Sequence, residues 1–220
     1  MNEVDCYPQN NTDLKTMNRL LRHRLRNLCA GVTMTVDRIV QLAEHNHPDL
    51  AGRCDIVKIE MDRLQILTER MDLLYDTLPP VRKITLFELM TEIRGWFVSS
   101  FPCCDLVLDG PVEAVEIGLG SYLLTVLKEL LLNAGEATAD QRVKLKWSVG
   151  MNGAIGFEVI NSLRESVPAN INLSLPQPFV TSKSRHDGLG LAIIRRLGYA
   201  GDFNIELFAD AKEFKAKVIL

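Results

Sequence analysis

Apolar residues recur at steps of three or four along residues 14–78, and this spacing predicts two long amphipathic helices. The first helix has about nine turns and can be capped at residues 11–13, Asn-Thr-Asp. A polar stretch that contains Pro48 interrupts the pattern, because proline breaks a helix interior. Pro79 and Pro80 end the second helix. The stripes consist of Leu14, Met17, Leu21, Leu25, Leu28, Val32, Val36, Ile39 and Ala43, then Val57, Met61, Leu64, Leu67, Met71, Leu74 and Leu78.

Two long helices with a short connection predict an antiparallel helical hairpin over residues 10–80. A single hairpin of this kind cannot bury both apolar stripes well. Two copies packed together form a four-helix bundle, which covers both stripes. We therefore expect a homodimer formed through these residues.

The pattern changes after the two prolines, where short apolar runs mix with helical periods. The order lacks the strand–helix–strand regularity of parallel sheets, which favours an α+β sandwich over residues 81–220. The predicted fold class is therefore α+β, an N-terminal antiparallel helical hairpin followed by an α/β sandwich. Strands are expected at 82–86, 106–108, 143–149, 155–160, 203–208 and 214–220, and helices at 87–101, at 121–139 with Ser121 as its cap, and after Gly188.

Composition narrows the class of protein. The chain is 47% hydrophobic and 24% charged, which is typical of globular domains, and its net charge of −3 argues against nucleic acid as a partner. No apolar run approaches the roughly 20 residues that span a bilayer, and the N-terminus lacks a signal-peptide core. We expect a cytoplasmic protein without membrane insertion. The five cysteines have no metal-binding spacing, and Cys29 and Cys54 fit buried helix positions.

His23 is the first candidate for chemistry. It lies two residues from both Leu21 and Leu25, about 200° around the helix, so its side chain points away from the apolar stripe. Asn27 follows one turn later on the same face, and we expect Arg22, Arg24 and Arg26 to surround the pair. An accessible imidazole nitrogen suits a phosphoryl acceptor, and arginines hold phosphate oxygens. Taken alone, the pattern is also that of an ordinary solvated helix face.

Two further segments carry phosphate chemistry. Glu129 and Asn133 share a helix face, where an amide oxygen can bind Mg²⁺ and a carboxylate can act as a base. Gly188 and Gly190 precede a helix, so backbone N–H groups there can approach phosphate oxygens, and Lys183 adds a cation. A charged helix edge and a plain loop are the ordinary alternatives.

The three segments together resemble the two-component histidine kinase family with a GHKL-type ATP-binding domain. The order matches: a histidine-bearing hairpin, an N box at 129–137, the stretch PFVTSK at 178–183 and a G2 box, GLGLAI, at 188–193. The closing GDFNIELFADAKEFKAKVIL is similar to the last strands of that domain, and the resemblance spans about residues 14–220.

The resemblance implies a role for each candidate. His23 is the phosphorylated histidine, and Asn27 matches the polar position linked to phosphatase activity toward a response regulator receiver domain. The implied cofactors are ATP and Mg²⁺, with Asn133 ligating Mg²⁺ and Glu129 acting near the γ-phosphate. The triphosphate contacts are Gly188 and Gly190, with Lys183 nearby.

Two positions depart from the family pattern. Arg24 stands where the family has an acidic residue after the histidine. In the G1 box, Asn161 replaces the aspartate that accepts from the adenine amino group, both glycines are missing, and the segment up to Phe179 is short. An uncharged acceptor costs about 1.5–3 kcal/mol, or about ten- to a hundredfold in affinity.

Three functions remain open on the sequence. We favour a sensor-less cytosolic histidine kinase that phosphorylates His23 from Mg-ATP and passes the phosphoryl group to a response regulator aspartate. The first alternative is an ATP-independent histidine phosphotransferase, a phosphorelay intermediate, which the G1 departures and Arg24 favour. The second is a receiver-binding or scaffold module in which no phosphate moves.

Overall fold

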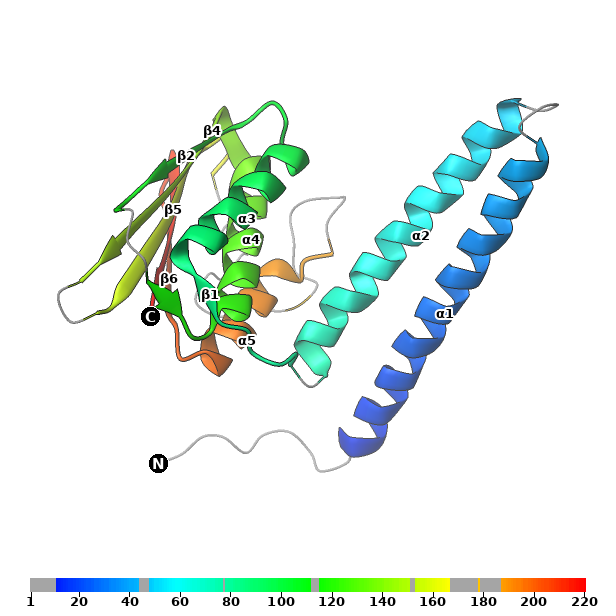
Figure 1. The fold of residues 1–220 in the computed structure, drawn as a ribbon, viewed down its shortest axis with the longest axis horizontal. Helices are drawn as coiled ribbons and strands as arrows, with labels where there is room; N and C mark the ends of the chain where they lie inside the picture. Colours follow the sequence, from blue (N-terminus) through cyan, green and yellow to red (C-terminus); the bar gives the residue numbers. More distant parts are fainter. Residues whose placement is uncertain are drawn as a thin grey trace. The chain divides into compact units, whose positions relative to one another are not determined.

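The computed structural model describes residues 11–43, 48–76, 78–111, 115–150, 153–166, 178 and 187–220, apart from a few side chains in the two N-terminal helices. The chain divides into two compact units, Met1–Leu78 and Pro79–Leu220. A helical hairpin forms the first unit, and a sheet covered by helices forms the second (Figure 1). The predicted fold class is thus confirmed.

Two helices form the hairpin, α1 (Asn11–Ala43) and α2 (Pro48–Tyr75). Pro48 occupies the first position of α2, where its missing N–H costs nothing. Between the two helices, α1 buries Cys29 and Val36, which are seven residues apart, and α2 buries Cys54 and Thr68. The expectation that α2 extends to Leu78 was wrong: the helix ends at Tyr75.

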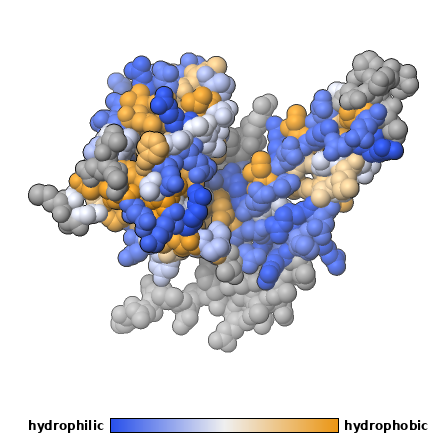
Figure 2. Space-filling model, viewed as in Figure 1, coloured by the Kyte–Doolittle hydropathy of each residue, from blue (hydrophilic) through white to orange (hydrophobic). Residues whose placement is uncertain are grey.

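The predicted α1 stripe divides between two faces. Val36 is buried against α2, whereas Leu21 and Leu28 remain more than half exposed within one chain. The surface of the hairpin therefore shows apolar residues among charged ones (Figure 2). The large exposed apolar residues there are Leu21, Leu28, Met34, Ile39, Leu50, Ile56, Val57, Ile59, Ile66 and Tyr75.

The second unit is an α/β sandwich. Its main sheet has the strand order β2-β4-β5-β7-β6, in which only the β2–β4 pair is parallel. Helices α3 (Leu86–Ser100), α4 (Gly120–Ala137) and α5 (Gly190–Ala200) lie on one face of this sheet (Figure 1). The strands are β1 (Ile84–Thr85), β2 (Asp105–Asp109), β3 (Glu116–Ile117), β4 (Thr138–Val149), β5 (Ile155–Leu163), β6 (Asn204–Ala209) and β7 (Glu213–Ile219), and β1 pairs with β3.

Side chains alternate between the two faces of the central strands, as a half-covered sheet requires. The helix side of β5 holds Ile155, Phe157, Val159 and Asn161, all buried. Helix α4 lies over β5 and also contacts α3 and α5, which makes it the centre of the core. No helix in the described part of the chain combines the length and apolar character that crossing a bilayer requires.

Several boundaries differ from the sequence prediction. Helix α3 begins at Leu86 because Thr85 and Glu88 form a capping box, and this leaves Phe87 72% exposed instead of in the core. Ser121 does not cap α4; its hydroxyl accepts from the backbone N–H of Arg82 at 3.1 Å. Strand β5 continues to Leu163, so Asn161 is a strand residue. The sequence prediction also missed β3.

Candidate functional site

His23 lies on the exposed surface of α1, as the helical period predicts. The Nδ2 atom of Asn27 is 3.4 Å from the Nε2 atom of His23, one turn further along the helix. Both side chains are solvent-exposed, so the imidazole is open to a reacting partner. This pair can present a nucleophilic nitrogen with an amide beside it.

The arginines near His23 have different surroundings, which the sequence prediction did not separate. Arg22 is only 1% exposed and lies between the two helices, where its Nε atom is 2.5 Å from Asp72 Oδ1. Arg26 is partly buried and also pairs with Asp72. Arg24 alone of the three is exposed and forms no ion pair within the described residues. The expectation that all three surround His23 was therefore wrong for Arg22.

Glu129 and Asn133 are both half-buried on α4, at the i, i+4 spacing that places them on one face. Buried leucines on the opposite face, Leu123, Leu127, Leu130 and Leu131, fix the helix orientation. Among the described residues, no cluster of three or more His, Cys, Asp or Glu side chains could hold a metal ion. An ion at Asn133 would therefore take most of its oxygen ligands from phosphate and water.

The glycine segment leads into α5. Gly188 has a φ of +68°, a left-handed conformation that side chains with a Cβ atom rarely adopt, and Gly190 is the first residue of the helix. Leu189 between them is buried and anchors the turn in the core. Among the described residues no side chain caps the N-terminus of α5, although Asp187 Oδ1 accepts from the backbone N–H of Leu189, just before the helix, at 3.0 Å. Its first N–H groups can therefore bind an anion, although Lys183 lies outside the described residues.

Asn161 has the least satisfied polar group of the predicted residues. The residue is 2% exposed, and its Nδ2 donates to the carbonyl oxygen of Ser162 at 2.8 Å. Its Oδ1 atom is buried and has no hydrogen-bond partner in the described part of the chain. A buried carbonyl oxygen without a donor costs about 1–3 kcal/mol, so this atom is ready to accept from a ligand.

A hydrogen-bond network holds the strand around Asn161. The hydroxyls of Ser162 and Thr138 donate to Asp140 Oδ1 at 2.7 and 2.8 Å. These two bonds lower the pKa of Asp140 below its ordinary value, and the bond from Ser162 has the larger effect. Arg164 Nε donates to the carbonyl oxygen of Thr138 at 2.7 Å. The network ties the end of β5 to the α4–β4 junction and thereby fixes the position of Asn161.

Asn133, Asn161 and Gly190 lie on α4, β5 and α5 of the sandwich unit, and α4 packs against both β5 and α5. His23 and Asn27 belong to the hairpin unit. The prediction from sequence missed two residues, Asp72 of α2 and Asp76 just after the end of α2, which pair with arginines of α1. The sequence did contain a signal for these pairs. The two aspartates are four residues apart, and Arg22 stands seven residues before the buried Cys29, at a position that faces the other helix.

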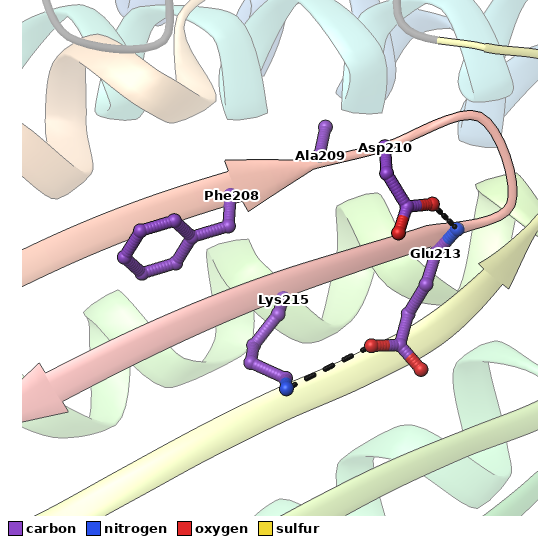
Figure 3. A pocket seen from close by; sticks show the side chains of 5 residues that line it. All are labelled: Phe208, Ala209, Asp210, Glu213 and Lys215. Atoms are coloured by element: carbon purple, nitrogen blue, oxygen red, sulfur yellow. Dashed lines mark hydrogen bonds and ion pairs between the residues drawn. The ribbon is translucent and has the colours of Figure 1, made fainter.

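An open cavity of about 380 Å³ lies at the β6–β7 turn and is lined by Phe208, Ala209, Asp210, Glu213 and Lys215 (Figure 3). Asp210 Oδ1 accepts from the backbone N–H groups of Lys212 and Glu213 at 2.7 and 2.8 Å. These two bonds lower the pKa of Asp210. The Asp210 carboxylate therefore stabilises the turn between β6 and β7. None of the predicted site residues lines this cavity.

No protein-family model matches the chain. The sensory histidine kinase/phosphatase NtrB of Rhodobacter capsulatus is 23% identical over 197 residues, which cover 82% of this chain and 54% of NtrB. The chain therefore spans about half the length of the curated relative it matches.

Solved structures with a similar fold are histidine kinases. Full-length ShkA in complex with AMPPNP superposes with a TM-score of 0.71 at 17% identity, covering 92% of this chain and 45% of ShkA. The kinase AdeS of Acinetobacter baumannii superposes with a TM-score of 0.59 at 14% identity, and the match covers 86% of this chain and 94% of AdeS. The catalytic domain of ThkA superposes with a TM-score of 0.55 at 22% identity, and the match covers 64% of this chain and 95% of that domain.

The ShkA and AdeS matches cover more of the chain than either unit alone provides, whereas the match to the ThkA catalytic domain covers 64% of it. The chain has the fold of the histidine kinase core, and its sequence is similar to that of a histidine kinase.

Proposed function

We propose that the chain is the core of a histidine kinase, in which His23 takes the γ-phosphoryl group of Mg-ATP and passes it to the aspartate of a response regulator receiver domain. The observation that carries ATP dependence is the buried, unpartnered Oδ1 atom of Asn161. It occupies the position that the resemblance assigns to the adenine acceptor. An abandoned nucleotide site has no reason to keep a polar atom buried at such a cost.

The residues of the sandwich unit fit a nucleotide. Asn161 would accept from the adenine amino group, and the N–H groups near Gly188 and Gly190 would bind phosphate oxygens. Asn133 would ligate Mg²⁺, with Glu129 close to the γ-phosphate and Lys183 as a further cation. The bound Mg²⁺ neutralises phosphate charge and orients the transferred group.

His23 would supply the nucleophile. One of its imidazole nitrogens would form a bond to phosphorus while the bond between the γ-phosphorus and the β–γ bridging oxygen breaks; ADP would leave, and the imidazole N–H proton would pass to solvent. The Asn27 amide, 3.4 Å from Nε2, is placed to orient a water molecule in the reverse, phosphatase direction.

We also propose that two hairpins of residues 10–80 pair as a homodimer. Leu21 and Leu28 on α1, and Ile59 and Ile66 on α2, are each seven residues apart and more than half exposed in one chain. Seven-residue spacing is the repeat of helices that pack side by side in bundles. A second hairpin of the same sequence offers matching stripes, which would bury these side chains.

The phosphorelay intermediate is the second candidate, and a specific observation favours it. Arg24 follows His23, and the nearest acidic residues along the described part of α1 are Asp13 and Asp37, each more than two turns away. A histidine without a neighbouring carboxylate lacks a base on its own helix. A phosphorylated receiver could then be the donor instead of ATP. In a pure binding module, the third candidate, no phosphate moves at all.

One labelling experiment separates the three functions. The wild-type chain and the His23→Gln variant are each incubated with Mg-ATP that carries a labelled γ-phosphate, and in parallel with a labelled phospho-receiver. Acid-labile label from ATP on the wild type alone supports the kinase. Label from the receiver alone selects the relay, and label from neither source leaves the binding module.

A further inference from the structure

A ladder of ion pairs connects α1 and α2 beside His23. Arg22 contacts Asp72 at 2.5 Å and Asp76 at 3.4 Å. Arg26 pairs with Asp72, and Arg19 lies 3.6 Å from Asp76. The three arginines are one turn apart along α1, and the two aspartates are four residues apart, Asp72 in the last turn of α2 and Asp76 directly after it.

The ladder has more positive than negative groups. Three arginines face two aspartates, so one positive charge of the ladder is not balanced by a carboxylate within the described residues. Moreover, the Nη1 atom of Arg22 is buried without a hydrogen-bond partner there. A phosphoryl group carries about two negative charges near neutral pH. The excess positive charge of the ladder therefore favours a phosphoryl group beside it.

Helix geometry determines which arginines adjoin His23. At 100° per residue, Arg19 and Arg26 lie about 40° and 60° from His23 around α1, both on the side toward α2. One precedes His23 by a turn and the other follows it by a turn, which is the spacing of contacting side chains. Arg24 lies about 100° away on the opposite side. Arg22 also lies about 100° away, but it is buried between the helices.

We propose that Arg19 and Arg26 bind the phosphoryl group on His23, with Asp72 and Asp76 holding both guanidinium groups ready for it. The inference rests on the proposed role of His23 as a phosphoryl acceptor. A guanidinium group has five N–H donors, so Arg26 can keep one contact to Asp72 and direct others to phosphate oxygens. Arg19, whose side chain is 73% exposed, can turn from Asp76 to the phosphoryl group without leaving a buried charge.

Chemical phosphorylation tests this without any ATP or partner protein. Potassium phosphoramidate transfers its phosphoryl group to histidine: the imidazole nitrogen bonds to phosphorus, the P–N bond of the reagent breaks, and ammonia leaves with the imidazole proton. The full chain is treated and its phosphohistidine followed by phosphorus NMR against pH. The chain has four histidines, so the signal lost in His23→Gln identifies the one of interest.

The variants are Arg19→Gln, Arg26→Gln and Arg26→Lys, with Arg24→Gln as the matched control. Nearby guanidinium groups favour the dianionic phosphoryl group. We expect its titration midpoint at His23 to be lower in the wild type than in Arg19→Gln and Arg26→Gln. Arg24→Gln should behave as the wild type. Arg26→Lys should recover only part of the shift, because a lysine ammonium group cannot bind bidentately.

Each outcome decides one point. Equal midpoints in all variants, or an equal change in Arg24→Gln, would overturn the ladder as a specific phosphoryl site. Failure of phosphoramidate to label His23 would instead overturn its proposed role as an acceptor. Arg26→Lys keeps the charge that faces Asp72, so it guards against a result that reflects only loss of folding.

Discussion

Asn161 offers the sharpest separation between a structural and a nucleotide-binding residue. Leucine has nearly the shape of asparagine but no polar atoms, so Asn161→Leu removes both the unpartnered Oδ1 and the bond to the Ser162 carbonyl. Asn161→Asp does the opposite. It places a carboxylate oxygen where Nδ2 now donates to that carbonyl at 2.8 Å, so two acceptors face each other.

The opposing effects can be estimated. Removing an unpartnered buried oxygen gains about 1–3 kcal/mol, and losing the Ser162 bond costs about 0.5–1.5 kcal/mol. Without nucleotide, the free energy of unfolding of Asn161→Leu should therefore lie between about 0.5 kcal/mol below and about 2.5 kcal/mol above that of the wild type, and above it at the middle of both ranges. With nucleotide, a buried amino group without an acceptor costs about 1–3 kcal/mol, which is about five- to 150-fold in affinity. Without nucleotide, stability should decrease from the Leu variant to the wild type to the Asp variant. ATP affinity should decrease in the opposite order, from Asp to Asn to Leu.

Thermal unfolding without ligand measures the ranking in stability, and calorimetric titration with Mg-ATP measures the ranking in affinity. Inosine triphosphate is the matched control nucleotide, since it carries an oxygen in place of the adenine amino group. The wild type should prefer ATP, and Asn161→Leu should lose that preference. An unchanged ATP affinity in Asn161→Leu, together with a clear fall in stability, would show that Asn161 is only structural.

Three further predictions concern other parts of the molecule. Gly120→Ala places a Cβ atom 2.9 Å from the Ile84 backbone nitrogen and against its side chain, so thermal unfolding should show a loss of about 1–3 kcal/mol, whereas Gly95→Ala, with nothing within 4 Å, should gain about 0.5–1 kcal/mol. Because the pKa of Asp140 is lowered by folding, its contribution to stability is present above the unfolded value of about 3.9 and lost as pH falls through the lower folded value. The difference in melting temperature between wild type and Asp140→Asn should therefore shrink as the solution is acidified below about pH 4, and a constant difference would contradict this. Leu28→Glu should turn a dimer into a monomer in analytical ultracentrifugation, while Met34→Glu, also exposed but outside the seven-residue spacing of Leu21 and Leu28, should not.

The overall fold could be predicted because its signals are periodic. The steps of three and four gave both hairpin helices, and the short apolar runs at 155–160 and 214–220 gave the strands β5 and β7. Boundaries were less accessible where a specific hydrogen bond sets them. Helix α3 begins where Thr85 and Glu88 cap each other, and Ser121 binds the backbone of Arg82 rather than capping its own helix. Such pairings depend on segments that meet only in the folded chain.

The candidate site followed from sequence only where a motif fixes the local backbone. The glycines before α5 are an example, since Gly188 adopts the left-handed conformation that glycine allows. Asn161 was identified by its place in the motif, but its burial and the lack of a described partner for its oxygen depend on β5 continuing three residues further than the predicted strand. The polar residues Asn161 and Ser162 hid that extension, because only pairing with β7 keeps them in the strand.

The arginine ladder was hidden for a different reason. Arg22 stands seven residues before Cys29 and fourteen before Val36, so it holds a core position that the apolar stripe passes over. Replacing a buried ion pair with apolar residues is often neutral or stabilising, so packing alone does not account for Arg22 and Asp72. A polar layer at that point does hold Arg19 and Arg26, which lie one turn before and one turn after His23 along the helix. Apolar packing cannot hold them. A simultaneous change of Arg22 to Leu and Asp72 to Leu should therefore preserve or raise the melting temperature while abolishing the low titration midpoint of phosphorylated His23, and a variant that keeps this midpoint would show that the ladder serves only the hairpin.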